Sequence, residues 1–420
     1  MLTRTLVWLV VSFLLLPLAS CAGAQGNDER KAAFDEVWER INSNFYDANF
    51  GGHDWEAIGQ EYRAKAVSAE TEKDFYVTLN EMLFRLEVSH IGVIPNEHPE
   101  WIGAPATFMN GEVGLDIRIV DERIVVVRRK AQLQDAPAIQ PGSVITSLNG
   151  LSLDDFMAEV LEPPVPAIPP LMLATERAGR ELFRDAGESV EITYLNEKGV
   201  EESVTLTAFP REGAVEMIQG IPPVYLEFES RTVGDDIGYI RFNSFHPNLT
   251  NRILEAIREY RDLPGLVIDV RGNSGGDFQV RRAIAEHLIT ERALVWRYVN
   301  RFGTDDIVLD PAPNSYRGDV VFLVDEMSAS SAEELSGAMQ ALGRAKVVGR
   351  RTAGLVLVAD VQPLDIGATL VYPSAETRFT NGVAPEGKGI TPDVTVSYDV
   401  PSLRAGRDVQ LEAAIELLRQ

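Results

Sequence analysis

Val321–Gln340 has the sequence VFLVDEMSASSAEELSGAMQ, and its order of side chains predicts a buried strand, a short turn and a helix. The helix is expected to begin near residues 330–333, SSAE, where backbone N–H groups converge and the helix dipole favours a developing negative charge. A serine at Ser330 is therefore well placed for nucleophilic chemistry. The same SSAE is also an S-x-x-E capping box, which needs no chemistry to explain it.

Length and composition predict a multidomain globular protein. The chain has 420 residues, 45% of them hydrophobic, which exceeds one ordinary domain and allows sizeable cores. The net charge of -24 argues against nucleic acid as a partner and against binding of anionic lipid through basic patches. No cofactor or metal is expected, because the sequence has neither paired His or Cys spacings for zinc nor a calcium loop.

The N-terminus, residues 1–21, is typical of an export signal. Its apolar run LVWLVVSFLLLPLA is too short and wrongly flanked for a standing transmembrane helix. The chain's single cysteine, Cys21, follows LAS at 18–20, and this tetrad resembles the lipobox of bacterial lipoproteins. The resemblance implies a lipid anchor at Cys21 in the membrane of the bacterial cell envelope, facing the periplasm or the exterior. Signal cleavage after AGA at 22–24 is the alternative, and Asn27–Lys31 is expected to be a short tether.

The next region, residues 28–105, is predicted to be a small helical bundle. Its first helix is indicated by apolar residues at helical spacing: Phe34, Val37, Trp38, Ile41 and Phe45. A second helix is expected over Trp55–Val67. A third is expected to begin at Thr71, where Asp74 completes a capping box, and to end in EVSHIG at 87–92.

Residues 106–212 change to strand patterns with two short helices. VGLD at 113–116, APAIQPGSVITSLNGLSL at 136–153 and VEITY at 190–194 together resemble a PDZ domain of the bacterial, protease-associated kind. Such domains bind extended peptides by adding a strand to a sheet edge. A small β-sandwich without a ligand is the alternative interpretation.

The last region, residues 222–420, alternates strands with helices, which predicts an α/β core with parallel pairing. One of its strands, GLVIDV, is followed by the glycine-rich loop RGNSGG. Glycines let the backbone present N–H groups to a ligand without a Cβ in the way. Because the loop matches neither the phosphate-binding nor the dinucleotide-binding pattern, an oxyanion-binding loop is the better prediction.

The ordered segments DVRGNSGG, FLVDEMSASSAE, GRAKVVGRRTAG and EGKGITPD resemble the S41 family of serine peptidases, which includes the C-terminal processing and the tricorn-like proteases. The resemblance covers nearly the whole mature chain and implies an α/β multidomain protein with a core of the ClpP/crotonase-like type. It places the nucleophile at Ser330. It implies the backbone N–H groups of Ser331 and Gly275 as donors to the oxyanion.

At the position of the catalytic base, the sequence differs from the processing branch of the family, which uses a lysine after a T-x-G. Here that run is TAGLV, and the lysine position holds Leu355, which cannot take a proton. The tricorn-like branch uses instead a histidine preceded by a serine in the N-terminal helical block and a glutamate near the end of the core. Ser89, His90 and Glu386 match those positions. Imidazole has a suitable pKa for a base, and Glu386 is expected to act electrostatically.

The sequence therefore predicts a secreted serine peptidase that cleaves peptides or unfolded protein by acyl transfer. Lys388 is a weaker candidate base, and His53, His98, His246 and His287 are expected to be surface or structural residues. One alternative is a catalytically inactive binding protein on the same fold, for a peptide or a small apolar ligand, which the leucine at 355 favours. A peptide-binding adaptor acting through the PDZ-like segment is another. No oligomeric state follows from the sequence.

Overall fold

The computed structural model describes residues 21–98, 109–133, 139–160, 168–196, 198–215 and 224–420. Residues 1–20 of the predicted signal segment 1–21 lie outside them, as do residues 136–138 of the PDZ-like pattern. Cys21 is the first residue of the first helix. Within the described ranges, no helix is both long and apolar enough to cross a membrane.

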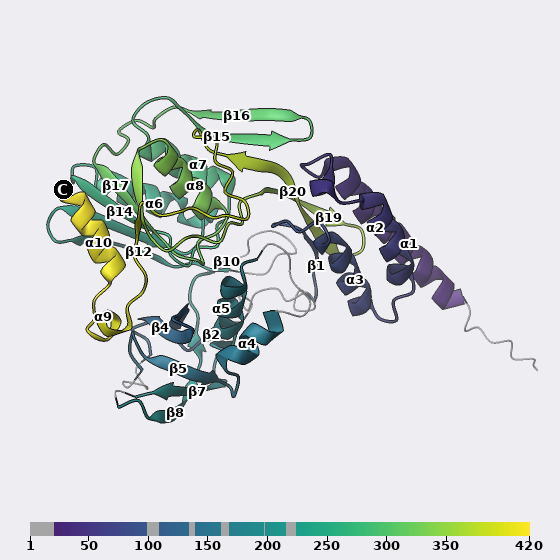
Figure 1. The fold of residues 1–420 in the computed structure, drawn as a ribbon, viewed down its shortest axis with the longest axis horizontal. Coiled ribbons are helices and arrows are strands. Elements are labelled where there is room, and N and C mark those ends of the chain that lie inside the picture. Colours follow the sequence, from purple (N-terminus) through teal and green to yellow (C-terminus); the bar gives the residue numbers. More distant parts are fainter. Residues whose placement is uncertain (1–20, 99–108, 134–138, 161–167, 197, 216–223) are drawn as a thin grey trace, which may run out of the picture.

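Three helices form the N-terminal block, at the right of Figure 1: α1 (Cys21–Asn44), α2 (Trp55–Val67) and α3 (Glu72–Phe84), with a short 3-10 turn η2 (Phe50–Gly52). The bounds of α2 are those predicted, and Thr71 with Asp74 forms the predicted capping box of α3. The tether expected at Asn27–Lys31 is wrong, because this stretch is part of α1. The side chain of Arg30 donates to the carbonyl of Ala69, which ties it to the end of α2.

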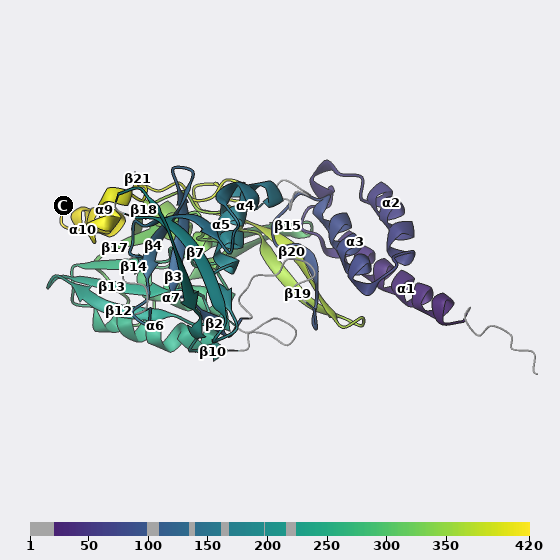
Figure 2. The ribbon, with the colours of Figure 1, turned by 90° about the horizontal axis from the view of Figure 1, so that it is seen from below.

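The helical block shares a sheet with the core. That sheet contains β1 (Gly92–Pro95), β15 (Ala293–Asn300), β16 (Gly303–Leu309), β19 (Val358–Leu364) and β20 (Ala368–Arg378). Strand β20 pairs with β1, β15 and β19. The apolar faces of the helices pack on β20 in one cluster, which includes Phe34, Leu79, Leu370 and Tyr372. The block is therefore built into the core, although in Figure 2 its helices lie at one end of the molecule.

The central sheet of the core has the predicted parallel α/β architecture. Its strands, in spatial order, are β12 (Phe228–Val233), β13 (Ile237–Phe242), β14 (Gly265–Asp269), β17 (Asp319–Val324), β18 (Ala345–Gly349) and β21 (Val394–Thr395). All neighbours from β13 to β21 are parallel, and β12 is an antiparallel edge strand. Because β14 and β17 are neighbours, their carboxyl ends place RGNSGG beside the turn that carries Ser330.

Helices cover both faces of this sheet. One face packs against α6 (Pro247–Glu259), α7 (Phe278–Leu288) and α8 (Ser331–Ala341), and the other against α10 (Val409–Leu418). Alternate residues of the strands serve the two faces: Val320 and Phe322 face α8, whereas Val321 and Leu323 face α10. A strand buried on both faces explains the continuous apolar run in its sequence.

The PDZ-like segment lies below the core in Figure 1. Its five-stranded sheet consists of β3 (Leu115–Val120), β4 (Arg123–Arg129), β5 (Val144–Leu148), β7 (Ser189–Leu195) and β8 (Glu201–Thr207). The smaller elements of this segment are β2 (Gly111–Glu112), β6 (Phe183–Arg184), β9 (Phe209–Pro210), α4 (Leu153–Val160) and α5 (Pro170–Arg180). A separate two-stranded sheet of β10 (Ala214–Val215) and β11 (Val224–Tyr225) follows it in the chain. The C-terminal α9 (Val400–Arg404) packs against this unit. The PDZ assignment itself stays a prediction.

Candidate active site

Ser330 lies at the sharp turn between β17 and α8, with φ 53° and ψ -121°. A positive φ is uncommon for a residue with a side chain and persists only where the surroundings hold it. Here the N–H of Ser330 donates to the carbonyl of Leu355 at 2.9 Å and to Glu333 Oε2 at 3.2 Å. The turn therefore holds the serine in a conformation that the chain would not adopt by itself.

His90 lies in the loop between α3 and β1, and its Nε2 is 3.2 Å from Ser330 Oγ. The expectation that the third helix ends at Ser89 and His90 is wrong, since α3 ends at Phe84. Tight i→i+3 hydrogen bonds follow the helix, and Glu87 has φ 52°, which stops it. The loop that results carries His90 back to the core, next to β1.

The second imidazole nitrogen, His90 Nδ1, is 2.8 Å from Ser89 Oγ. If Nε2 accepts the hydroxyl proton of Ser330, Nδ1 carries the ring proton and donates it to Ser89. Burial lowers the pKa of His90 to about 4, so the imidazole is neutral at neutral pH. A neutral imidazole facing a serine hydroxyl is able to act as a general base.

Glu386 reaches the histidine through Ser89. Its Oε1 accepts the backbone N–H of Ser89 at 3.0 Å, and its Oε2 accepts the N–H of Val356 at 2.7 Å. Burial raises the pKa of Glu386, against the effect of these donors. Lys388, the weaker candidate base, is exposed and lies 3.5 Å from the carbonyl of Ala384.

Of the two predicted oxyanion donors, Ser331 and Gly275, only Gly275 already donates its N–H to another described group. Ser331 is the first residue of α8, so its N–H has no intrahelical acceptor. Gly275 approaches Ser330 so closely that a Cβ on it would lie 2.6 Å from Ser330 Cβ, which explains why a glycine is needed there. However, the N–H of Gly275 donates to Asn273 Oδ1 at 2.8 Å. Its amide is therefore already in use.

Leu355 belongs to a small apolar cluster with Met172, Ala329 and Ala353. The position at which the processing branch carries lysine is thus surrounded by hydrocarbon here. Met172 comes from α5, so the PDZ-like segment reaches the residues next to the nucleophile.

In the sequence Glu333 is visible only as a local capping residue, whereas in the structure it has a wider role. The S-x-x-E pattern was the available signal, and Glu333 does accept the N–H of Ser330. It is also fully buried and accepts three further hydrogen bonds from residues 352–355. Among all the described residues, no three His, Cys, Asp or Glu side chains are grouped so that they could hold a metal ion.

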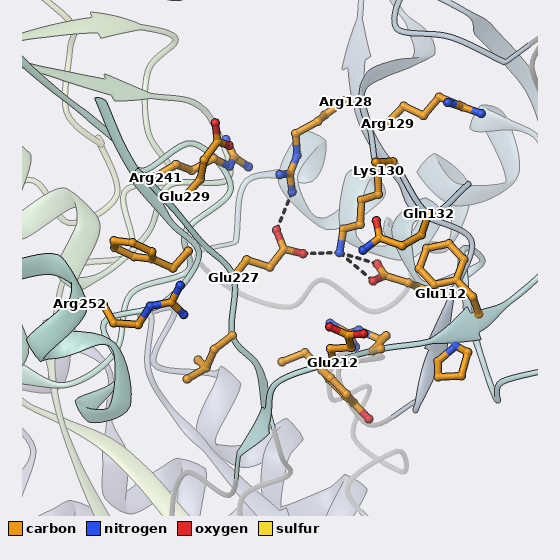
Figure 3. A pocket seen from close by; sticks show the side chains of 17 residues that line it. Glu112, Arg128, Arg129, Lys130, Gln132, Glu212, Glu227, Glu229, Arg241 and Arg252 are labelled. Atoms are coloured by element: carbon orange, nitrogen blue, oxygen red, sulfur yellow. Dashed lines mark hydrogen bonds and ion pairs between the residues drawn. The ribbon is translucent and has the colours of Figure 1, made fainter. Parts of the chain in front are cut away.

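A separate polar cavity of about 540 Å³ lies between the PDZ-like segment and the core. Figure 3 shows that Arg128 from β4 and Lys130, which directly follows that strand, point toward Glu227, and that Lys130 also meets Glu112. Charged side chains line it from both units, and Ser330 and His90 are not among the lining residues.

Comparisons with known proteins agree with this fold. Residues 236–396 match Peptidase family S41, and residues 27–84 match the Tricorn protease C1 domain. The Carboxyl-terminal-processing protease of Synechocystis sp. is 26% identical over 96% of this chain and 90% of that protein. The Tricorn protease of Thermoplasma acidophilum is 24% identical over 93% of this chain, which spans 35% of that longer protein. The solved Photosystem II D1 C-terminal processing protease superposes with a TM-score of 0.59 at 21% identity, covering 93% of this chain and 97% of that one.

Over residues 236–396 the chain is therefore similar to Peptidase family S41, and residues 27–84 are similar to the Tricorn protease C1 domain, a match that ends shortly before His90.

Proposed function

We propose that this chain is a serine peptidase that hydrolyses peptide bonds with Ser330 as nucleophile and His90 as base. The observation that carries the proposal is the distance of 3.2 Å between Ser330 Oγ and His90 Nε2, two residues 240 positions apart in the chain. A nucleophile bonded to a base whose other nitrogen has a further partner is the arrangement that activates a serine.

In this mechanism Ser330 Oγ attacks the carbonyl carbon of the scissile bond while its proton passes to His90 Nε2. The imidazolium then gives that proton to the leaving amine, and an acyl-enzyme ester forms at Ser330. Water attacks the ester with His90 again as the base, which releases the acid and restores the serine. Throughout these steps His90 Nδ1–H donates to Ser89 Oγ, and Glu386 Oε1 accepts the backbone N–H of Ser89.

The N–H of Ser331 is the first donor to the oxyanion. The N–H of Gly275 becomes the second only when the side chain of Asn273 releases it, because that amide is bonded at 2.8 Å. Removing one donor of an oxyanion hole costs about 10²–10³ in kcat in a well-studied protease, so this release would change the rate strongly.

The substrate in this proposal is a peptide or an unfolded protein segment, which the PDZ-like segment presents to the core. A lipid anchor at Cys21 and a place in the bacterial cell envelope complete the proposal, and they rest on the LASC tetrad at 18–21.

The proposal is tested by labelling the full chain, purified in mild detergent, with a fluorophosphonate serine probe. Ser330→Ala and His90→Ala should each lose labelling, whereas the controls Ser68→Ala and His53→Ala should keep it. Full labelling of folded Ser330→Ala would refute the proposal. A folded wild type that stays unlabelled would favour the inactive binding protein.

A further inference from the structure

Beside the nucleophile lies Glu333, a buried carboxylate that has no charged partner among the described residues. It is on the first turn of α8, and its side chain is fully buried. Its hydrogen bonds come from neutral groups only. A buried charge without a counter-ion is costly unless hydrogen bonds satisfy it, so its presence needs a reason.

Four donors converge on this carboxylate. Its Oε2 accepts the N–H of Ser330 at 3.2 Å and the N–H of Leu355 at 2.9 Å. Its Oε1 accepts the hydroxyl of Thr352 at 2.5 Å and the N–H of Gly354 at 2.7 Å. An ionised carboxylate is acceptor-only and has enough lone pairs for four donors, whereas a protonated acid or an amide presents a donor of its own.

These contacts hold the strained residue. Ser330 has a positive φ, and its N–H lies between Glu333 Oε2 and the carbonyl of Leu355. Fixing this amide fixes the direction of the Cα–Cβ bond, which restricts Oγ to the few staggered positions around that bond, and in the one observed it lies 3.2 Å from His90 Nε2.

The loop that bonds to Glu333 also bonds to Glu386, the carboxylate next to Ser89. Leu355 gives its N–H to Glu333, and the next residue, Val356, gives its N–H to Glu386 at 2.7 Å. Thr352 Oγ1 also accepts the N–H of Ile390 at 2.6 Å, which joins the segment that follows Glu386. The loop 352–356 therefore connects Glu333, which is bonded to the nucleophile Ser330, to Glu386, which is bonded to Ser89 beside the base His90.

We propose that Glu333, as a carboxylate, is a positioning residue: it locks Ser330 into the conformation in which its hydroxyl reaches His90, and it fixes the 352–356 loop beside Glu386. This inference rests on the proposed function of Ser330. Glu333 acts through Ser330 and touches no substrate.

The reactivity of Ser330 should then depend on the ionisation of Glu333. Burial raises the pKa of Glu333 to about 7, so the serine should react faster as pH rises through that value. The titratable and charged groups around it are His90 beyond Ser330, Glu386 beyond Val356, and the Arg281–Glu334 ion pair between α7 and α8. Burial lowers the pKa of His90 to about 4, so its titration should fall at a lower pH than this change.

The experiment measures the second-order rate of fluorophosphonate labelling of the full chain from about pH 5 to about pH 9, with unfolding temperatures alongside. Glu333→Gln should label about 10²-fold more slowly at the alkaline end, since a small misplacement of the reacting atoms costs that much. It should also lose the step near pH 7, which is the rise in labelling rate that accompanies ionisation of Glu333. The matched control is Glu326→Gln, because burial also raises the pKa of Glu326 to about 7 but its side chain bonds to Arg350. It should keep the step. This comparison also separates Glu333 from Glu386, which both variants retain.

Thr352→Val keeps the test decisive if Glu333→Gln does not fold. It removes one donor to the carboxylate, so the pKa of Glu333 should rise and the step should move to higher pH, with a smaller loss of rate. Wild-type labelling of Glu333→Gln, a step that stays in it, or an unmoved step in Thr352→Val would each overturn the inference. Labelling that survives in Ser330→Ala would instead remove the proposed function itself.

Discussion

The core meets its two neighbouring units in opposite ways. The helical block pairs β1 with β20 over Gly92–Pro95 and buries a common apolar cluster with that strand. The PDZ-like segment combines smaller apolar contacts, at α9 and at Met172, with ion pairs: Arg118 pairs with Asp325, and Arg128 with Glu227 at the polar cavity of Figure 3. The first contact is a paired strand with a shared apolar cluster, whereas part of the second consists of ion pairs, which can exchange partners.

The difference matches what each unit contributes to the site. The helical block supplies His90, whose Nε2 must stay within hydrogen-bond reach of Ser330. Among its described residues, the PDZ-like segment supplies none that bond to Ser330 or His90. Two indirect links join it to the site: Met172 packs beside Ala329 and Leu355, and Arg118 holds Asp325, which also accepts the N–H groups of Gly272 and Met327.

The largest expected effect comes from weakening the apolar contact. Leu370→Ala should lower the free energy of unfolding by about 2–5 kcal/mol, because it opens a cavity in the shared cluster, and should slow labelling of Ser330 by displacing His90. Leu206→Ala, in the core of the PDZ-like segment, is the control and should destabilise that unit without slowing labelling. Denaturant unfolding and fluorophosphonate rates measure both. Equal slowing in the two variants would contradict the comparison.

Breaking the buried ion pair should cost about as much stability as a moderate cavity. In Arg118→Met the carboxylate of Asp325 stays buried without its cation, and such a loss costs about 3 kcal/mol. Arg123→Met, whose arginine is exposed on the same unit, is the control and should change the free energy of unfolding by well under about 1 kcal/mol. Near-identical unfolding curves for Arg118→Met and wild type would show that this contact is not a fixed one.

His90 should make the helical-block contact sensitive to acid. Its pKa is about 4 in the folded protein, whereas a free histidine titrates near 6.5, so the unfolded chain binds the extra proton first. Stability should therefore fall by about 2–3 kcal/mol as pH drops from about 6.5 to about 4. Thermal unfolding of wild type and His90→Gln over this range measures the effect. The unfolding temperature of His90→Gln should change less with pH than that of the wild type. If the two proteins change equally with pH, His90 is not buried in the site.

The smallest expected effect is at the polar cavity. Glu227→Gln removes the anion that Arg128 and Lys130 share, but its side chain is 30% exposed, so the loss should be about 1 kcal/mol or less. The difference from wild type should shrink further as salt is added, which urea unfolding at two ionic strengths can measure. A loss as large as that of Arg118→Met would mean that both ion-pair contacts are equally fixed.

Local patterns predicted much of the fold. The bounds of α2, the capping box of α3 and the parallel core followed from apolar periodicity and cap residues. The hairpin of β15 and β16 was not predicted, because β16 is mostly exposed and carries Asp305 and Asp306, unlike a typical strand. The pairing of β1 with β20 joins residues about 280 positions apart, and no local pattern indicates such a partner.

The candidate site divides in the same way. The positions of Ser330, His90 and Glu386 were predicted from motif resemblance, but the contacts between them depend on how distant segments pack. Glu333 was visible as a capping residue, yet its three other donors come from a loop some twenty residues later. The bond between Gly275 and Asn273 depends on one side-chain rotamer, which no motif specifies.

Successive backbone amides of one loop, those of Leu355 and Val356, are bonded to the two carboxylates of the site. Exchanging the side chain at Leu355 leaves both amides in place, so this position should tolerate substitution. Thr352 and Gly354 should not, because Thr352 donates its hydroxyl to Glu333 and a Cβ at Gly354 would lie 2.8 Å from the amide nitrogen of Gly389. Adding or deleting one residue between Thr352 and Val356 would present the wrong amide to each carboxylate, so the length of this loop should matter more than the side chain at Leu355.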